Sequence, residues 1–218
     1  MVEMVDAVAQ ADAGLRARKK QRTRAMLIEA AVALCDRQGF EETTVEQIAA
    51  VAAVSPRTFS RYFASKEAVV LAFVDEVVEL IAQELVKQPP GISDIEALFR
   101  AHVQAFLNTE TAPPTALTAD RLLASARIIS SSGALMQAAS QFRYDAVNGV
   151  LALRMGVPRN HRRLKLTSAV WGSIIMTAVA KLGSNIDWAT ITVERVVDGM
   201  RSTYAEFLEV TGTADRAI

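Results

Sequence analysis

The stretch Thr43–Lys66, TTVEQIAAVAAVSPRTFSRYFASK, predicts two short helices joined by a tight turn. Thr44 precedes an apolar run and has Gln47 three residues later, so the two can form a capping box that starts a helix at about Val45. Ser55-Pro56 repeats the signal, because serine can accept the first free N–H groups and proline fits the first helical position. A second helix is therefore expected from Pro56.

The face of the second helix predicts what the pair of helices binds. Ala52 to Val54 leaves a joint of about three to four residues, the length found in helix-turn-helix units. Phe59 and Phe63 are expected to pack inward with Val54. The other side chains are of types that hydrogen-bond to base edges or phosphates, namely Arg57, Thr58, Ser60, Arg61 and Tyr62. This face is chemically suited to the major groove of DNA.

Further signals flank the two helices in a fixed order. They are Gln38-Gly39-Phe40, Thr43-Thr44-Val45, Ile48-Ala49, Val54-Ser55, Phe59, Tyr62-Phe63 and Ser65-Lys66-Glu67. With them, residues 22–66 resemble the TetR family of bacterial transcriptional regulators. Ala53 departs from the family, which usually has glycine at a joint position that favours a left-handed backbone. Because alanine in that conformation costs about 1 kcal/mol, a slightly altered turn is expected.

The resemblance assigns roles by position. It implies that Arg57, Thr58, Ser60 and Arg61 face or read the bases, and that phosphates are contacted by Thr44, Tyr62 and Lys66. Six of the nine residues from 16 to 24 are Arg or Lys and none is acidic. Such a run can be simply a solvated helix start, but ahead of a helix-turn-helix it predicts salt-sensitive phosphate contacts through Arg18, Lys19 and Lys20.

The overall composition describes a globular chain. Hydrophobic residues make up 51% and charged residues 22% of the 218, and 24 basic side chains balance 24 acidic ones, so net charge gives no argument for nucleic acid.

Cys35, the single cysteine, allows no internal disulfide and is expected in the core, with a redox-sensing thiol as the sharper alternative. Residues 1–14 lack the basic start of a signal peptide. The uncharged run 166–180 is shorter than the roughly 20 residues of a membrane helix, and a cytoplasmic protein is expected.

The remaining pattern predicts an all-α fold of about nine helices, because apolar residues recur at helical spacing and no alternating run competes. A flexible tail (1–14), a helix-turn-helix DNA-binding domain (15–64) and a ligand-binding and dimerisation domain (65–218) are expected. The helices outside the two described above are expected near residues 15–38, 65–85, 93–107, 116–129, 134–155, 158–182 and 190–210.

The last two of these helices carry more apolar surface than one packing seam requires. Burial in the core of a monomer would explain either helix alone. The resemblance implies instead that they form a four-helix bundle in a homodimer. Two recognition helices about 34 to 36 Å apart would then meet successive major grooves of a palindromic operator.

The resemblance also implies a small-molecule cavity in the C-terminal domain, whose occupation moves the fourth helix and releases DNA. An apolar residue on a buried helix needs no ligand, so each apolar candidate is more readily explained as core. Two arginines on one helix, Arg121 and Arg127, could meet an anion or could be solvated or paired with acids. The candidate lining residues are Phe99, His102, Val103, Phe106, Arg121, Leu122, Arg127, Met136, Phe142, Tyr144, Trp171, Ile175 and Met176.

The nature of the ligand is a hypothesis only. Residues 127–158 resemble, at low specificity, the C-terminal domain of actinobacterial regulators that respond to fatty acyl-coenzyme A esters. A lipophilic or anionic effector, including one of acyl-coenzyme A type, is therefore proposed at this point.

No catalytic motif is found. His102 and His161 lie far apart in the sequence, and there is no HExxH pattern, Gly-x-Ser-x-Gly elbow or glycine-rich phosphate loop. Neither an enzyme nor a metal or cofactor is expected. The sequence predicts a DNA-binding transcriptional regulator, a ligand-released homodimeric repressor. The alternative is a helical DNA-binding protein without an effector, architectural or gated by a partner; a helical enzyme is the weaker alternative.

Overall fold

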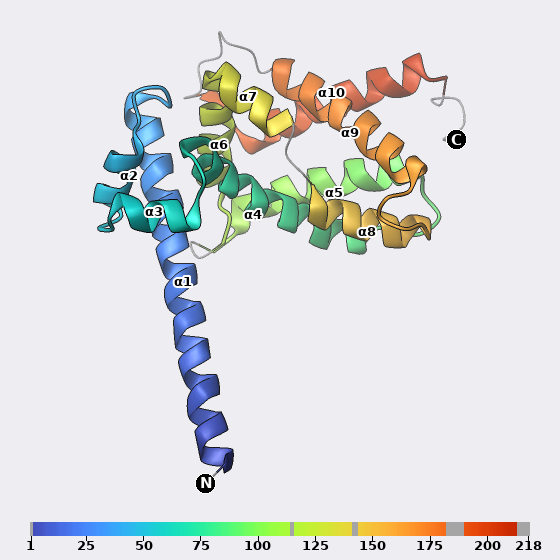
Figure 1. The fold of residues 1–218 in the computed structure, drawn as a ribbon. Helices are drawn as coiled ribbons and strands as arrows, with labels where there is room; N and C mark the ends of the chain where they lie inside the picture. Colours follow the sequence, from blue (N-terminus) through green and yellow to red (C-terminus); the bar gives the residue numbers. More distant parts are fainter. Residues whose placement is uncertain (1, 114–115, 141–143, 182–189, 213–218) are drawn as a thin grey trace. The chain divides into compact units, whose positions relative to one another are not determined.

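The computed structural model describes residues 2–113, 116–140, 144–181 and 190–212, without the side chains of residues 2–13, 16, 17, 140 and 181. Within these ranges it contains ten α-helices and one short 3-10 helix and no strand (Figure 1). The all-α prediction is confirmed. The chain divides into two compact units, an N-terminal unit of residues 1–72 and a C-terminal unit of residues 73–218.

The N-terminal unit contains α1 (Val2–Gln38), α2 (Val45–Val51), α3 (Pro56–Tyr62) and the start of α4 (Lys66–Val86). Apolar side chains from all four helices are buried, among them Leu27, Leu34, Ile48, Phe59 and Val69. α1 packs against α2, and α2 packs against α3. These buried side chains form a small core that supports α3.

Helix α1 begins at Val2, earlier than the predicted start near Leu15, so residues 2–14 are helical where a flexible tail was expected. The segment is rich in alanine, which has the highest helix propensity, and a single glycine at residue 14 costs only about 1 kcal/mol. The boundary between the two units also differs from the predicted one, since it falls inside α4, after Ala72. The first turn of α4 is tied to the N-terminal unit, because the Lys66 ammonium donates to the backbone oxygen of Phe40 at 2.8 Å.

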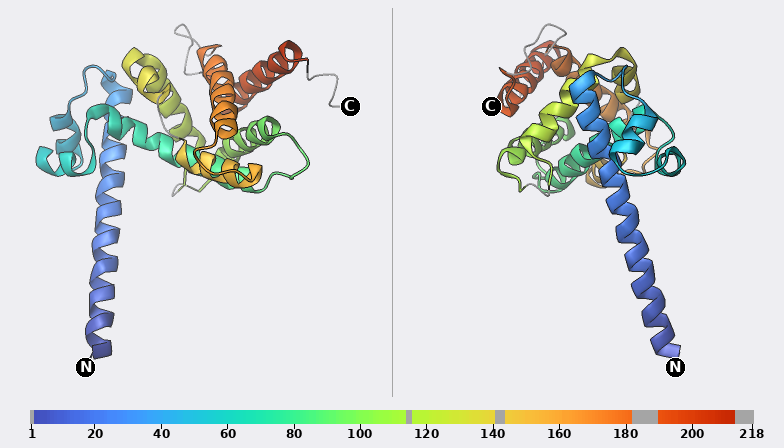
Figure 2. Two further views of the ribbon diagram at one scale, coloured as in Figure 1. Left: turned by 45° about the vertical axis from the view of Figure 1, so that its right-hand side comes forward. Right: turned by 90° about the vertical axis from the view of Figure 1, so that its left-hand side faces the viewer.

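The C-terminal unit continues with α5 (Asp94–Asn108), a 3-10 helix (Thr109–Thr111), α6 (Ala119–Ser131), α7 (Gly133–Ser140), α8 (Asp145–Met155), α9 (Arg162–Lys181) and α10 (Val193–Val210). Its main core joins residues of α4, α5, α8 and α9. Helix α10 buries Val193, Val196, Val197 and Met200 at helical spacing and packs against α9 and α5 (Figure 2).

The single helix predicted over residues 134–155 is wrong. The structure has two helices there, α7 and α8, which brings the count to ten in the described ranges. Tyr144 stands at the N-cap of α8 with non-helical dihedral angles (φ −73°, ψ 54°) and packs on the core. Tertiary packing of this ring therefore competes with the helical propensity of the segment, and neither proline nor glycine marks the break.

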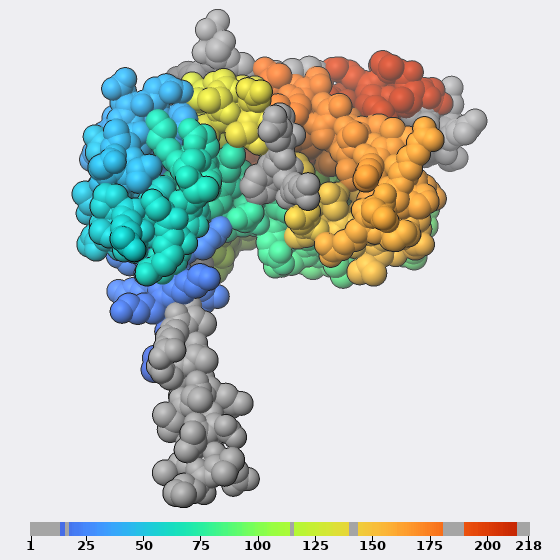
Figure 3. Space-filling model, in the orientation of Figure 1, coloured from blue at the N-terminus to red at the C-terminus, as the bar shows by residue number. Residues whose placement is uncertain are grey.

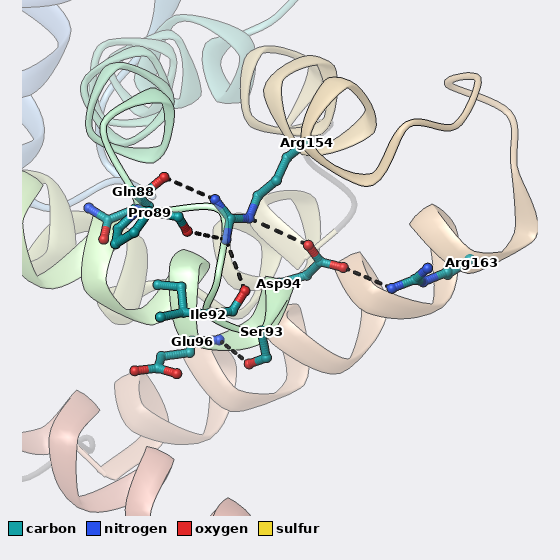
Figure 4. Close-up of polar contacts among 8 residues, drawn as sticks. All are labelled: Gln88, Pro89, Ile92, Ser93, Asp94, Glu96, Arg154 and Arg163. Atoms are coloured by element: carbon teal, nitrogen blue, oxygen red, sulfur yellow. Dashed lines mark hydrogen bonds and ion pairs between the residues drawn. The ribbon is translucent and has the colours of Figure 1, made fainter. Parts of the chain in front are cut away.

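Arg154 of α8 ties together the loop between α4 and α5 (Figure 4). Its guanidinium donates hydrogen bonds of 2.6 to 3.0 Å to three backbone oxygens, those of Gln88, Pro89 and Ile92. The Asp94 carboxylate, at the start of α5, lies 3.5 Å from Arg154 Nε and 3.2 Å from Arg163 of α9. One side chain thus satisfies three carbonyls of the loop that follows α4.

Candidate nucleic-acid interface and internal pocket

Helix α2 begins with the predicted capping box. The backbone N–H of Gln47 donates to Thr44 Oγ1 at 3.2 Å, and the backbone N–H of Thr44 donates to Gln47 Oε1 at 3.0 Å. Gln38, at the end of α1, also donates to Gln47 Oε1 at 3.0 Å. The cap therefore fixes both the start of α2 and its link to α1, and the predicted start at Val45 is confirmed.

Helix α3 also begins as predicted. Pro56 is its first residue, and Ser55 Oγ accepts a hydrogen bond of 3.1 Å from the backbone N–H of Thr58. The hydroxyl groups of Ser55 and Thr58 lie 3.0 Å apart. Two consecutive N-caps, both formed by local side chains, thus define the two helices of the motif.

The joint between the helices keeps the left-handed conformation at Ala53, whose φ is +53°. The backbone N–H of Ala53 donates to the oxygen of Ala50 at 3.0 Å, and that of Val54 donates to Ala49 at 2.9 Å. The altered turn predicted for this joint is therefore wrong. The two hydrogen bonds that close the end of α2 hold alanine in a backbone region that costs it roughly 1 to 2 kcal/mol.

The outer face of α3 is polar and basic. Phe59 and Phe63 are buried beneath it, as predicted, whereas Arg57, Ser60 and Arg61 are exposed. Together with Thr58, the three exposed residues line a hollow on the surface of the N-terminal unit, whose atoms are drawn in blue to teal in Figure 3. The sequence prediction thus names residues that share one surface.

Two arginines on this surface have free hydrogen-bonding groups. Among the described residues, the Arg57 side chain has no hydrogen-bond or ion-pair partner. Arg61 lies with its guanidinium 5.4 Å from the centre of the Tyr62 ring, a stacking contact that leaves the N–H edge of the guanidinium available. By contrast, the Ser60 hydroxyl donates to the Pro56 oxygen at 3.1 Å. Arg57 and Arg61 are therefore the strongest donors on this face.

The residues expected at phosphates are partly exposed and partly half-buried. Thr44 is exposed, Tyr62 is half-buried, and Arg18, Lys19 and Lys20 are exposed along α1. Lys66 is half-buried, and its ammonium already donates to the backbone oxygens of Phe40 (2.8 Å) and Glu41 (3.3 Å). It also lies 4.2 Å from the centre of the Phe40 ring. Lys66 is therefore first a structural residue that closes the turn after α1, which its sequence position did not indicate.

The C-terminal unit contains an apolar pocket of about 150 Å³ between six of its helices, α4, α5, α6, α7, α9 and α10, and Tyr144 at the start of α8. Six of the predicted ligand-binding residues line it: Phe106, Leu122, Met136, Tyr144, Ile175 and Met176. Eight others were not predicted: Val74, Val77, Ser125, Ala126, Ile129, Ala139, Val179 and Val196. The spacing of the α6 residues, 122, 125, 126 and 129, is that of one helical face and could have indicated them.

Several predicted ligand-binding residues lie away from this pocket. Phe99 stacks on Tyr204 with ring centres 4.2 Å apart. Arg121 forms an ion pair of 3.1 Å with Glu76 and donates to the Ala116 oxygen at 3.1 Å. Val103 and Arg127 are half-buried and absent from the described lining. Phe142 lies outside the described residues.

His102 and Trp171 belong instead to a smaller hollow of about 30 Å³, which Tyr144 and Ile175 also line. The Trp171 indole N–H donates to His102 Nε2 at 3.1 Å, and His102 Nδ1 lies 2.7 Å from the Leu98 oxygen. These contacts require the neutral ring with the proton on Nδ1. Burial lowers the pKa of His102 to about 4, and the hydrogen bond to Leu98 opposes this only in part. His102 is therefore a core histidine in a satisfied pair.

Cys35 is buried in the N-terminal unit, as expected for a core residue. Burial raises the pKa of its thiol, although a hydrogen bond with Thr43 and the charge of Lys66 act in the opposite direction. A raised pKa disfavours the reactive thiolate.

None of the helices in the described part of the chain is both long enough and apolar enough to cross a membrane.

Comparison with known proteins gives matches at two levels. Residues 27–73 match the family described as bacterial regulatory proteins, tetR family. The HTH-type transcriptional regulator TcmR of Streptomyces glaucescens is 47% identical over 91 residues. That similarity spans 40% of this chain and 40% of the length of TcmR.

Solved structures extend the likeness beyond the matched domain. SmeT, the repressor of the Stenotrophomonas maltophilia multidrug efflux pump SmeDEF, is 20% identical with a TM-score of 0.50, over 84% of this chain and 89% of SmeT. This likeness shows a shared fold. Thermus thermophilus FadR, solved in complex with lauroyl-CoA, is 23% identical over 83% of this chain and 93% of FadR, with a TM-score of 0.43.

The geometry and the matches together define the class. An all-α chain with two consecutively capped helices and an exposed basic face on the second is a helix-turn-helix protein. Through residues 27–73, the N-terminal domain of this chain matches the TetR family of bacterial regulatory proteins. Members of that family are transcriptional regulators and not enzymes.

Proposed function

We propose that this protein is a sequence-specific, DNA-binding transcriptional repressor in which α3 enters the major groove. The observation that carries the proposal is the exposed face of α3, where Arg57 and Arg61 offer N–H groups to the outside of a rigidly capped helix. Arginine recognises guanine through two parallel hydrogen bonds, which is the commonest base-specific contact. Arg57, Thr58, Ser60 and Arg61 are proposed to face the bases.

Phosphate contacts are proposed for a second group of residues. Thr44 caps the start of α2, Tyr62 is the last residue of α3, and Arg18, Lys19 and Lys20 are exposed on α1. Their contribution is independent of DNA sequence and weakens with salt, because phosphate neutralisation releases counterions. Lys66 is proposed to act here with the one N–H left by its two hydrogen bonds to backbone oxygens.

We further propose a homodimer that is formed through α9 and α10. The exposed side of α9 carries Leu166, 63% exposed, followed along one helical face by small uncharged or apolar side chains, Ala169, Ser173, Thr177 and Ala180. Small residues allow a second helix to approach closely, and an uncharged exposed stripe of this length favours an interface over solvent. Such a dimer would present two copies of α3 to a palindromic operator in the cytoplasm.

The pocket of the C-terminal unit supports release by a small molecule. Val74 and Val77 of α4 line it, and α4 is the helix that also contains the boundary with the N-terminal unit. A ligand that fits the pocket in only one conformation of α4 would shift the population of DNA-binding states. An architectural or partner-gated DNA-binding protein does not need such a pocket, so the pocket favours the ligand-released repressor.

Selection of bound sequences from random double-stranded DNA tests this function. The proposal predicts enrichment of a palindromic site whose half-sites are separated by one helical turn, about 10 base pairs, or a multiple of it. Recovery of unrelated sequences with no enriched motif would contradict sequence-specific binding. Enrichment of a single, non-palindromic half-site would contradict the dimer alone.

A further inference from the structure

The pocket of the C-terminal unit has a lining that discriminates between classes of ligand. Among the described residues that line it, none is charged, and only Ser125 and Tyr144 have polar side chains. Transfer of an ionised group into such surroundings without a partner is strongly unfavourable. The lining therefore favours a neutral ligand.

The two arginines that could have bound an anion, Arg121 and Arg127, do not line the pocket. Arg121 is held by Glu76 at 3.1 Å and stacks 5.4 Å from the centre of the Phe73 ring. Arg127 is on the same helix as Ser125 but does not line the pocket. A carboxylate or phosphate inside the pocket would consequently meet no cation among the described lining residues.

The size of the pocket sets a second limit. Its volume of about 150 Å³ is that of an apolar cavity which holds a single benzene-sized ring. Pockets for drug-sized ligands are larger, at roughly 300 to 1,000 Å³. The nucleotide and pantetheine of an acyl-coenzyme A ester do not fit within this volume and carry several charges, so they would have to lie outside the pocket.

The polar groups of the pocket define what the ligand can carry. The Ser125 hydroxyl donates to the Leu122 oxygen at 2.7 Å, so its own oxygen is left as an acceptor. Burial raises the pKa of Tyr144, which therefore stays a neutral phenol at physiological pH. A ligand with one hydroxyl group could donate to Ser125 while its ring contacts the apolar lining.

From these observations we propose that the effector is a small neutral molecule, about one aromatic or alicyclic ring in size, with at most one hydroxyl-type donor. The inference rests on the proposed ligand-released function and names the chemical class for that same pocket. Calorimetric titration of the full chain with benzyl alcohol, toluene, benzoate and octanoyl-coenzyme A tests it. Benzoate matches benzyl alcohol in size and differs in charge.

The expected order of affinity follows from the lining. Benzyl alcohol and toluene should bind, and benzoate should bind on the order of 100-fold more weakly or not at all. Ser125→Ala should weaken the binding of benzyl alcohol by roughly 3- to 10-fold and leave the binding of toluene unchanged. Ala126→Leu should fill the pocket and abolish binding of both, whereas Ala124→Leu, on the same helix but outside the lining, should preserve it.

Three results would overturn the inference. The first is binding of benzoate or octanoyl-coenzyme A at least as tight as that of benzyl alcohol, the second is unchanged ring binding in Ala126→Leu, and the third is absence of any ring binding. Operator binding without ligand is measured in parallel. If it persists while ring binding fails, the ligand class alone is wrong; if it is absent while the rings bind, the proposed regulatory function is wrong.

Discussion

At the scale of single residues, Ala53 is the position where local preference and tertiary structure disagree. The sequence indicated an altered turn, because alanine disfavours positive φ, yet φ at Ala53 is +53°. The turn is held by hydrogen bonds at both Ala53 and Val54 and by two capped helices. Local propensity could not predict this outcome, because the strain is offset by contacts on either side of the residue.

Replacement of Ala53 by glycine is therefore expected to stabilise the protein. Relief of strain outweighs the added entropy of the unfolded chain, and the free energy of unfolding should rise by about 1 kcal/mol. Urea denaturation checks the change. The matched control is Ala50→Gly on the exposed side of α2, which should lower the free energy by about 1 kcal/mol. A loss of stability in Ala53→Gly would contradict the strained turn.

His102 gives the protein a pH dependence of known sign. Its pKa is lowered to about 4 in the folded protein from an ordinary value of 6.5, so the unfolded state binds the proton more readily. The stability associated with the neutral ring is complete above pH 6.5 and is lost as the pH falls toward 4. Between about pH 6.5 and 5 the protein should lose about 2 kcal/mol through this group.

Denaturation at several pH values measures the effect. His102→Gln cannot titrate and retains a donor and an acceptor, so its stability should change much less in that interval. His161→Gln, at an exposed position, should show the same pH dependence of stability as the natural chain. If His102→Gln and the natural chain show the same slope, the buried neutral histidine is not its source.

At the scale of elements, sequence signals succeeded where the determinants are local. The predicted caps at Thr44 and Ser55 are formed by side chains within three residues of the groups they bind. The break between α7 and α8 was missed because neither proline nor glycine marks it in the sequence, and the Tyr144 ring beside it packs on the core. The backbone contacts of Lys66 were not indicated either, since its partner Phe40 lies far away in the sequence.

Arg154 provides a prediction about how helices are connected. Arg154→Met would leave three backbone oxygens and the Asp94 carboxylate without this partner, and Arg154 and Asp94 are only 11% and 18% exposed. The loss should be about 2 to 4 kcal/mol in the free energy of unfolding. Arg163→Met removes the other contact to Asp94 from a side chain that is 64% exposed, and should cost less than about 1 kcal/mol. Equal losses in the two variants would argue against the role of Arg154.

At the scale of the whole molecule, the sequence indicated a helical chain with a DNA-binding domain and a pocket, and missed part of the lining. The α6 residues that line the pocket share one helical face, so helical periodicity could have predicted them. Val74, Val179 and Val196 come together only through packing of helices distant in sequence, which periodicity does not determine. Arg121 and Arg127 were candidates for binding an anionic ligand because of their charge, but the ion pair of Arg121 with Glu76 depends on the same packing of helices.

The proposed dimer gives a prediction about assembly. Leu166→Glu introduces a charge into the exposed stripe of α9 and should shift the protein toward the monomer, because an unpaired charge in an apolar interface is costly. Sedimentation equilibrium measures the change. Leu153→Glu, on α8 and 83% exposed, is the control and should leave the association unchanged. A similar association constant for the natural chain and Leu166→Glu would argue against this interface.

Binding of the selected operator and of random DNA, measured by fluorescence anisotropy for the natural chain, Arg57→Ala and Lys20→Ala, determines whether α3 reads the DNA sequence. Arg57→Ala should lose roughly 1 to 3 kcal/mol on the operator and little on random DNA. Lys20→Ala should weaken both alike and lower the salt dependence. Equal loss on both DNAs for Arg57→Ala would mean that Arg57 on α3 does not read the base sequence.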